Sequence, residues 1–213
     1  MDIPEGRRRN MKMIFFDTET TGLKPGSICQ LSYITVDASV KPQITRGENI
    51  FFSVDYMEPS AEEVHGFSVE DLYELSGGLY FEDYFEKLYE EFSSADFLIG
   101  HNVNFDIAFL THEFEGCGED FSPKKVFCTM NYYKDICKLI NTRGERKNPK
   151  LAEVVNFLGI SEDTIREISG KFFGGTGNYH DARFDTAATY LIVIEGIKKG
   201  FIPRNYFSKQ LNN

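Results

Sequence analysis

The stretch that decides the fold reads Phe15-Phe16-Asp17-Thr18-Glu19-Thr20-Thr21-Gly22-Leu23. It lies at the end of an apolar run over residues 11–16, which is typical of a strand buried on both faces. Asp17 and Glu19 are two positions apart, so their side chains lie on the same face of that strand. Paired carboxylates in an apolar setting repel unless a cation lies between them, and hard divalent metals prefer carboxylate oxygens. The stretch therefore predicts a metal site, with an acidic strand end exposed to water as the alternative.

The length and composition predict one folded domain. The chain has 213 residues, of which 41% are apolar, and its 20 Phe and 11 Tyr indicate an aromatic core. No apolar run is long enough to cross a membrane. We expect a disordered leader over residues 1–10, a domain over residues 11–199 and a short C-terminal tail over residues 200–213.

The cysteines indicate the compartment. Their positions show no paired ligand spacing, which favours reduced thiols and argues against a zinc site. The first ten residues contain three consecutive arginines but no apolar segment, so a secretory signal is not expected. These features predict a cytoplasmic protein with no membrane partner.

Charge is spread unevenly along the chain. The formal net charge is −10, yet residues 124–150 contain eight Lys or Arg and two acids, a local charge of +6 that leaves −16 elsewhere. Such asymmetry suits a protein that meets a polyanion on one face. A solvated basic helix and loop is an equally good explanation of the charge alone.

The apolar pattern predicts an α/β fold. Strands are expected over residues 11–16, 28–38, 49–54, 95–100 and 126–130, the first three of them antiparallel. Helices are expected near residues 59–65 and from 68, and over residues 81–92, 107–114, 131–140, 151–158 and 186–197. No element is assigned to residues 160–178, where the glycines near 174–177 would let a loop move.

Three further residues complete a candidate site with Asp17 and Glu19. Asp106 comes in the first turn after the strand over 95–100, and is therefore expected at the carboxyl edge of the sheet, where α/β sites form. Asp185 opens the helix over 186–197, and His180 lies five residues before it on the preceding loop.

The order and spacing of these residues resemble the three motifs of the DEDDh family of 3′–5′ exonucleases, which includes the epsilon-type proofreading subunits of bacterial DNA polymerase III. The motifs correspond to residues 16–23, to His101-Asn102 with Phe105-Asp106, and to His180 followed by Asp185. The resemblance extends from about residue 12 to about residue 197. It implies a ribonuclease H-like mixed five-stranded sheet, with the first three strands antiparallel and helices on its flanks.

The resemblance also implies an activity. The protein is expected to hydrolyse phosphodiester bonds at the 3′ ends of single-stranded or frayed DNA, with Mg²⁺ or Mn²⁺, and to release nucleoside 5′-monophosphates. Two ions roughly 4 Å apart can address both ends of an in-line displacement. Asp17 would bridge both ions, Glu19 and Asp185 would help hold the nucleophile-side ion, and Asp106 would bind the other. His180 would be the general base.

Substrate contacts are assigned in the same way. Thr20 and Leu23 are expected to meet the terminal 3′-OH and the last base, and His65 and Phe67 to line the terminal-nucleotide pocket. Asn102, together with Phe105, is expected to brace Asp106. The further expectations are that Lys147 and Lys150 contact phosphates, that Asp181 lies on the surface and that His112 is exposed.

Several alternatives stay open. An exoribonuclease of the same family is the nearest rival, because the feature that separates DNA from RNA is the 2′-OH. A non-catalytic module that binds 3′ ends is another, although retention of all five site residues argues against it. A phosphatase with Asp17 as nucleophile would be expected to have Asp-x-Asp at this place, where this sequence has Asp17-Thr18-Glu19. Polymerase association is conceivable, but the short tail favours a stand-alone repair or degradation nuclease; the oligomeric state is left open.

Overall fold

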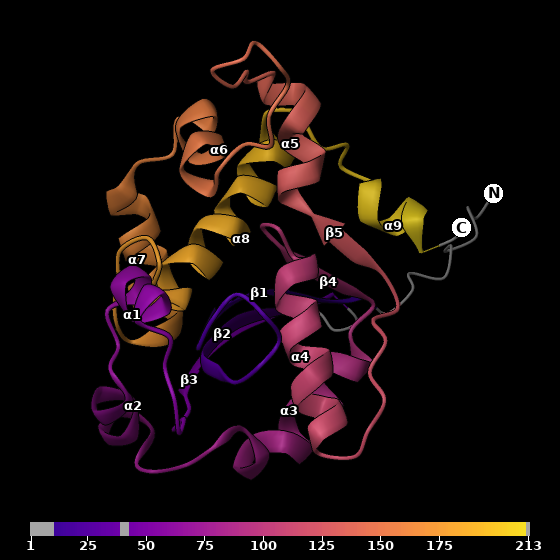
Figure 1. The fold of residues 1–213 in the computed structure, drawn as a ribbon. Helices are drawn as coiled ribbons and strands as arrows, with labels where there is room; N and C mark the ends of the chain where they lie inside the picture. The colour runs from indigo at the N-terminus through magenta and orange to yellow at the C-terminus, as the bar shows by residue number, and fades with distance from the viewer. Residues whose placement is uncertain (1–10, 39–42, 212–213) are drawn as a thin grey trace, which may run out of the picture.

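A mixed five-stranded β-sheet lies at the centre of the protein in this computed structural model, which describes residues 11–38 and 43–211 (Figure 1). The strand order is β3-β2-β1-β4-β5. The strands are β1 (Lys12–Thr20), β2 (Ile28–Asp37), β3 (Ile44–Phe51), β4 (Phe97–Gly100) and β5 (Val126–Cys128). Strands β1 to β3 are antiparallel, whereas β4 runs parallel to β1 and β5. The predicted fold class is confirmed; the predicted leader, residues 1–10, lies outside the described residues.

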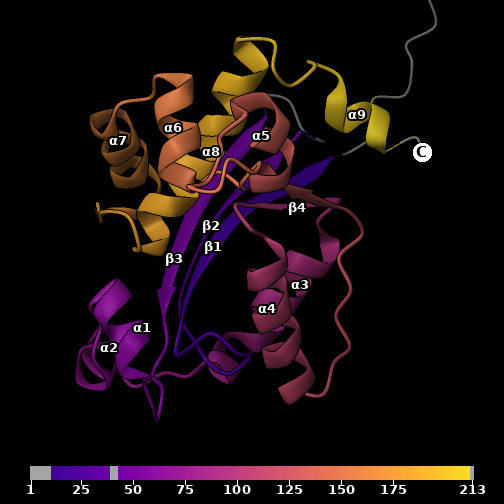
Figure 2. The ribbon, with the colours of Figure 1, turned by 45° about the horizontal axis from the view of Figure 1, so that its top comes forward.

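Helices cover both faces of the sheet (Figure 2). One face carries α5 (Thr129–Cys137), α6 (Leu151–Leu158), α7 (Glu162–Phe173) and α8 (Ala182–Lys198). The other carries the short η1 (Phe81–Tyr84), α3 (Phe85–Ser94) and α4 (Asn104–Gly116). Two short helices, α1 (Pro59–His65) and α2 (Val69–Ser76), lie beside the end of β3 (Figure 2).

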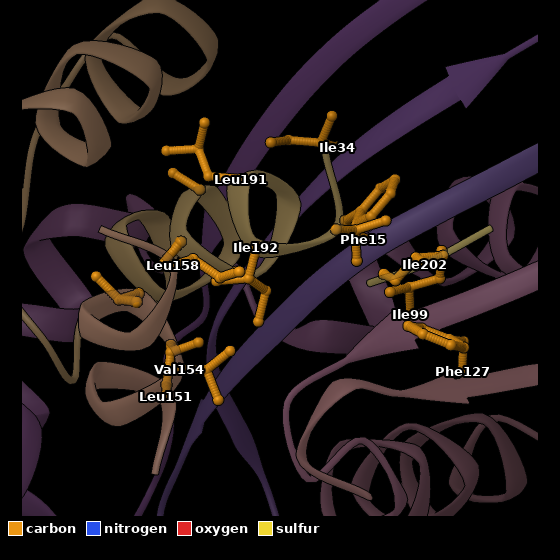
Figure 3. Packing of buried hydrophobic residues seen from close by; sticks show 14 of the residues in the cluster. Phe15, Ile34, Ile99, Phe127, Leu151, Val154, Leu158, Leu191, Ile192 and Ile202 are labelled. Carbon is orange, nitrogen blue, oxygen red and sulfur yellow. The ribbon is translucent and has the colours of Figure 1, made fainter. Parts of the chain in front are cut away.

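The central strand β1 is buried on both faces, as its sequence predicts. Phe15 belongs to the core beneath α8, while Ile14 and Phe16 belong to the core beneath α4. Figure 3 shows the first of these cores, in which apolar side chains of the sheet meet Ile192 and neighbouring residues of the helices. Each fully buried side chain of this size contributes about 1.5–3 kcal/mol to stability. Two packed cores therefore hold β1, and with it the acidic motif, in a rigid position.

Two elements differ from the sequence expectation. β3 runs from Ile44 to Phe51 and so begins five residues before the expected start at residue 49. The sequence hides this start because the edge strand is mostly polar, is half-buried and lacks an apolar alternation. α7 was not expected at all. Ser161 caps this helix by accepting a hydrogen bond from the backbone N–H of Thr164, and Ile165 anchors it in the core.

The C-terminal residues pack against the domain. Ile202 and Phe207 are buried in the core beneath α8, and the ring of Phe207 lies 5.2 Å from that of Phe97. Phe207 belongs to α9 (Tyr206–Gln210). Residues treated as a tail in the sequence thus complete the core at the β4–β5 side of the sheet. Within the described residues, no helix combines the length and the apolar character needed to cross a membrane.

Candidate active site

The alternation of side chains along β1 divides its polar end between the two helix layers. Asp17 and Glu19 lie two and four positions after Phe15, so their side chains are on the same face of β1 as that of Phe15. That face is covered by α8, whose first turn carries Asp185. Thr18 faces the opposite layer, where the first turn of α4 carries Asp106. The C-terminal end of β1 therefore meets one acid from each helix layer.

Three carboxylates form a compact cluster at this end of β1. Asp17, Glu19 and Asp185 each offer an oxygen, and these atoms lie within 4.8 Å of one another. Asp185 Oδ2 accepts the backbone N–H of His180 at 3.2 Å. Its other oxygen, Oδ1, is buried and has no hydrogen-bond partner among the described residues. Such an orphaned acceptor calls for a ligand or a proton.

Burial and mutual repulsion make these carboxylates hard to ionise together. The pKa of Asp17 is raised well above its usual value by burial and then by the charges of Asp106, Asp185 and Glu19. Burial and the charge of Asp185 likewise raise the pKa of Glu19. Burial raises the pKa of Asp185 to about 7, against the hydrogen bond from His180. The cluster needs positive charge, and its donor set and the free Oδ1 of Asp185 fit a hard divalent cation.

Asp106 lies outside that cluster and has a different environment. Its Oδ1 accepts two hydrogen bonds from Thr18, one from the backbone N–H at 3.1 Å and one from the hydroxyl at 2.8 Å. Burial raises the pKa of Asp106 to about 7, and the bonds from Thr18 oppose that shift. Thr18, for which the sequence predicts no role, thus supports Asp106, a role expected of Asn102 and Phe105.

His180 is exposed and lies on the loop that leads into α8. Its backbone is left-handed, with φ of 70°, a conformation that costs free energy for a residue with a Cβ. Its imidazole has no hydrogen-bond partner in residues 11–38 and 43–211, and it faces the same cleft as the acids. The ring is therefore free to exchange a proton with a molecule bound there.

A cleft of about 460 Å³ joins these groups to the predicted substrate residues. Thr20, Leu23, His65 and Asn102 all line it, with Leu23 81% exposed at its rim. Phe67 does not line it: its ring stacks behind His65, at 5.5 Å between ring centroids. The cleft wall also includes Ser60, Ala61 and Val64 of α1. Sequence reasoning did not assign Ser60 and Ala61 to the site, because the first turn of α1 resembles that of any surface helix.

His101 also lines the cleft, held by contacts at both ring nitrogens. Nδ1 lies 3.0 Å from Thr129 Oγ1 and Nε2 lies 3.0 Å from the carbonyl oxygen of Pro149. Burial lowers the pKa of His101 to about 4, so the ring is neutral at physiological pH. Its fixed ring joins the cleft wall to the end of the basic loop that precedes α6.

Asp181 is not the surface residue that the sequence suggested. Its side chain is buried and caps the N-terminus of α8. Burial alone would raise the pKa of Asp181, but hydrogen bonds and charge from Arg183 hold it below its usual value. Of the two lysines expected to contact phosphates, Lys147 forms an ion pair with Glu153 and Lys150 is exposed. His112 is exposed, as predicted.

The family model of the RNase T type, described as "Exonuclease", matches residues 14–193. The chain is 36% identical over 132 residues to the 3′-5′ exonuclease DinG of Staphylococcus haemolyticus (strain JCSC1435). That match covers 62% of this chain and 12% of the relative.

Solved structures share the fold. E. coli Exonuclease I in complex with a dT13 oligonucleotide is 19% identical with a TM-score of 0.69, over 92% of this chain and 42% of that one. Exonuclease I from Methylocaldum szegediense is 16% identical with a TM-score of 0.66, over 95% and 43%. The chain thus spans less than half the length of these structures and a small part of the curated relative.

Proposed function

Because the chain belongs to the DEDDh-type exonuclease family, we propose that it hydrolyses phosphodiester bonds at the 3′ ends of single-stranded or frayed DNA and releases nucleoside 5′-monophosphates. The observation that carries this proposal is the meeting of four acids and His180 on one cleft. Two of the acids come from β1, and one comes from each helix layer. All four acids of the motifs are present, whereas a module that only binds is expected to have lost one of them.

The acids are the candidate ligands of two divalent cations, Mg²⁺ or Mn²⁺. Asp17, Glu19 and Asp185 would hold one ion through the oxygens that already lie within 4.8 Å of one another. Asp106, with the oxygen that Thr18 leaves free, would hold the second together with Asp17. When bound, such ions lower the pKa of water and stabilise negative charge on a leaving oxygen.

His180 is the candidate general base. Its imidazole faces the cleft and has no competing hydrogen bond in the described chain, so a ring nitrogen is available to take the proton of the attacking water. The backbone N–H of the same residue is held by Asp185, which ties the base to the acid cluster. Proton acceptor and ligand cluster are thus joined by one contact.

The cleft suits the end of a strand. The turn after Glu19 lines the cleft, and there the Thr20 hydroxyl donates to the carbonyl oxygen of Gly22, which keeps the turn tightly folded. Leu23, Val64 and His65 offer apolar and aromatic surface to a terminal nucleoside. Base stacking on such surface tolerates any sequence. The DNA oligonucleotide bound by E. coli Exonuclease I, a protein of the same fold, favours single-stranded DNA over RNA as the substrate.

The test is a cleavage assay on matched polymers. The protein is incubated with 5′-labelled single-stranded DNA and RNA of one sequence, in Mg²⁺, Mn²⁺ or EDTA. We expect a ladder that shortens from the 3′ end, faster on DNA, and that is absent in EDTA and with Asp17→Asn. Chromatography of the products should give nucleoside 5′-monophosphates.

The rival functions predict other outcomes. Faster cleavage of RNA would favour an exoribonuclease on the same site. If the folded protein binds 3′ ends but cuts neither polymer with either metal, a non-catalytic module is the better explanation. His180→Ala should retain Mn²⁺ affinity while hydrolysis slows severely; a variant that cuts at the wild-type rate would contradict the assignment of the base.

A further inference from the structure

Within the described residues, hydrogen bonds hold the backbone of His180 but not its imidazole. The side chain is exposed and accepts or donates no hydrogen bond within the described residues, so no neighbour sets its orientation directly. Its own backbone is in the left-handed region. Whatever fixes the residues on either side of His180 therefore fixes the ring.

Asp181, the next residue, is held by a dense set of donors. Its Oδ1 accepts from the backbone N–H of Arg183 at 3.0 Å, from Arg183 Nε at 2.9 Å and from Gln30 Nε2 at 3.1 Å. Its Oδ2 accepts from Arg183 Nη2 at 2.6 Å. A helix cap needs only one of these bonds. The bond from Gln30 attaches the start of α8 to the sheet, whereas the bonds from the Arg183 side chain lie within the first turn of the helix.

Gln30 makes that attachment from the strand next to the acidic motif. It is fully buried on β2 and pairs in register with Glu19 of β1. Its amide nitrogen donates to Asp181 and, at 2.8 Å, to Asn49 Oδ1, and its amide oxygen accepts the backbone N–H of Ala182 at 3.1 Å. Both donors of a buried amide are thus satisfied, which makes the network rigid.

The glycine-rich loop before His180 packs directly on Asp181 and Arg183. A Cβ at Gly177 would lie 2.3 Å from the carboxyl carbon of Asp181, and one at Gly175 would lie 2.6 Å from Arg183 Nη1. These glycines permit a close approach of the loop to the Asp181–Arg183 pair. The Arg183 guanidinium also lies 5.6 Å from the ring centre of Phe51 on β3.

We infer that Asp181, held by Gln30 and Arg183, is a positioning residue that sets the placement of His180 relative to Glu19 and Asp185. The inference rests on the proposed function of His180 as the base. The bond from Gln30 to Asp181 joins the strand beside Glu19 to the residue that follows His180. The loop that precedes His180 packs on Asp181 and Arg183. Asp181 does not line the cleft, so it reaches His180 through the backbone; its charge is also felt by the carboxylates of Glu19 and Asp185.

The first test separates chemistry from binding. Asp181→Ala should lower kcat on a short DNA oligonucleotide about 10²-fold, the cost typical of a displacement near 1 Å. KM should stay within about twofold, and Mn²⁺ affinity should fall no further than it does in Asp181→Asn, which removes the same nearby charge and keeps the cap. Gln30→Met, which keeps the volume but removes the amide, should give a smaller fall in kcat in the same direction. Ser161→Ala is the matched control, because it removes the cap of α7 and should leave kcat unchanged.

The second test reads His180 without relying on activity. The chain has four histidines, so ¹³C-labelled histidine gives a simple spectrum that single substitutions can assign. In metal-free protein, Asp181→Ala should shift or broaden the ring signal of His180 and leave that of the exposed His112 unchanged. Ser161→Ala should change neither signal.

The outcomes are distinct. A wild-type protein that cleaves nothing refutes the proposed function, and the spectrum then decides the inference alone. Wild-type kcat and an unchanged His180 signal in Asp181→Ala would overturn the inference, as would a loss of Mn²⁺ affinity in parallel with kcat. Should Asp181→Ala fail to fold, Asp181→Asn serves instead: it keeps the cap and the Gln30 contact but loses the acceptor for Arg183 Nη2. Its kcat should fall below that of the wild type by less than about 10²-fold, and a wild-type kcat with an unchanged His180 signal would overturn the inference.

Discussion

Thr18 donates both its backbone N–H and its hydroxyl to one oxygen of Asp106, although the two residues are 88 positions apart. The pair joins β1 to α4 across the face of the sheet that the other motif acids do not occupy. Both donors go to Oδ1, so Oδ2 receives no bond from Thr18, and Asp106 lines the cleft. The residue between the two acids of β1 thereby orients the third acid of the site.

Replacement of Thr18 by Val tests this relationship. Val has the shape of Thr but lacks the donor, so a buried carboxylate loses one of its two bonds, a change that costs about 1–3 kcal/mol when the acceptor is charged. We expect lower stability in EDTA, measured by urea unfolding, and a larger loss near pH 8 than near pH 5. Cleavage should slow by about tenfold or more.

Thr18→Ser is the control for this substitution. It restores the hydroxyl and should recover most of both the stability and the rate. If Thr18→Val unfolds at the same urea concentration as the wild type at both pH values, the hydroxyl does not support Asp106.

Neutralising Asp185 should separate activity from stability. Burial raises the pKa of Asp185 to about 7, so its contribution to stability is present below its unfolded pKa near 3.8 and is lost as the pH rises through 7. Asp185→Asn removes that loss and still accepts the His180 N–H. In EDTA near pH 8 the variant should melt at a higher temperature than the wild type, while cleavage falls by more than about 10²-fold.

The matched control is Glu86→Gln, which neutralises an exposed acid on α3. It should change neither the melting temperature nor the rate. A less stable Asp185→Asn in EDTA would contradict the view that the cluster is held together against its own repulsion.

Cation binding should release protons. With pKa values near 7 for Asp106 and Asp185, the metal-free site binds protons at neutral pH, and a divalent cation displaces them. Calorimetric titration of Mn²⁺ near pH 7, in two buffers of different ionisation enthalpy, should therefore give different heats. The release should be larger near pH 6.5 than near pH 8.5, and smaller in Asp185→Asn. Equal heats in the two buffers would count against raised pKa values in the free site.

Much of the site was predictable because its residues stand out from the sequence pattern immediately around them. Two acids at the end of a doubly buried strand violate the pattern around them, and Asp106 and Asp185 each follow the start of a helix. A period of two along β1 already places Asp17 and Glu19 on one face. These signals need no knowledge of long-range contacts.

The remaining features depend on contacts between distant segments. Asp181 resembles a surface acid in its own neighbourhood, but it is buried, and its bond to Gln30 joins it to a strand 151 positions away. β3 has little apolar alternation because it is an edge strand, so its start depends on pairing with β2. Local periodicity carries no information on either contact.

Glu113 of α4 offers a test of buried charge away from the acid cluster. Its carboxylate accepts the backbone N–H of Ile28 at 2.7 Å, and burial raises the pKa of Glu113 from 4.5 to about 7. The stability that it contributes is thus complete below about pH 4.5 and is lost as the pH rises through 7. Glu113→Gln keeps an acceptor for Ile28 without the charge. In EDTA it should match the wild type near pH 4.5 and exceed it near pH 8, on the order of 2 kcal/mol by urea unfolding. The exposed Glu115→Gln should show no such trend, and a difference that stays flat across this range would refute the assignment.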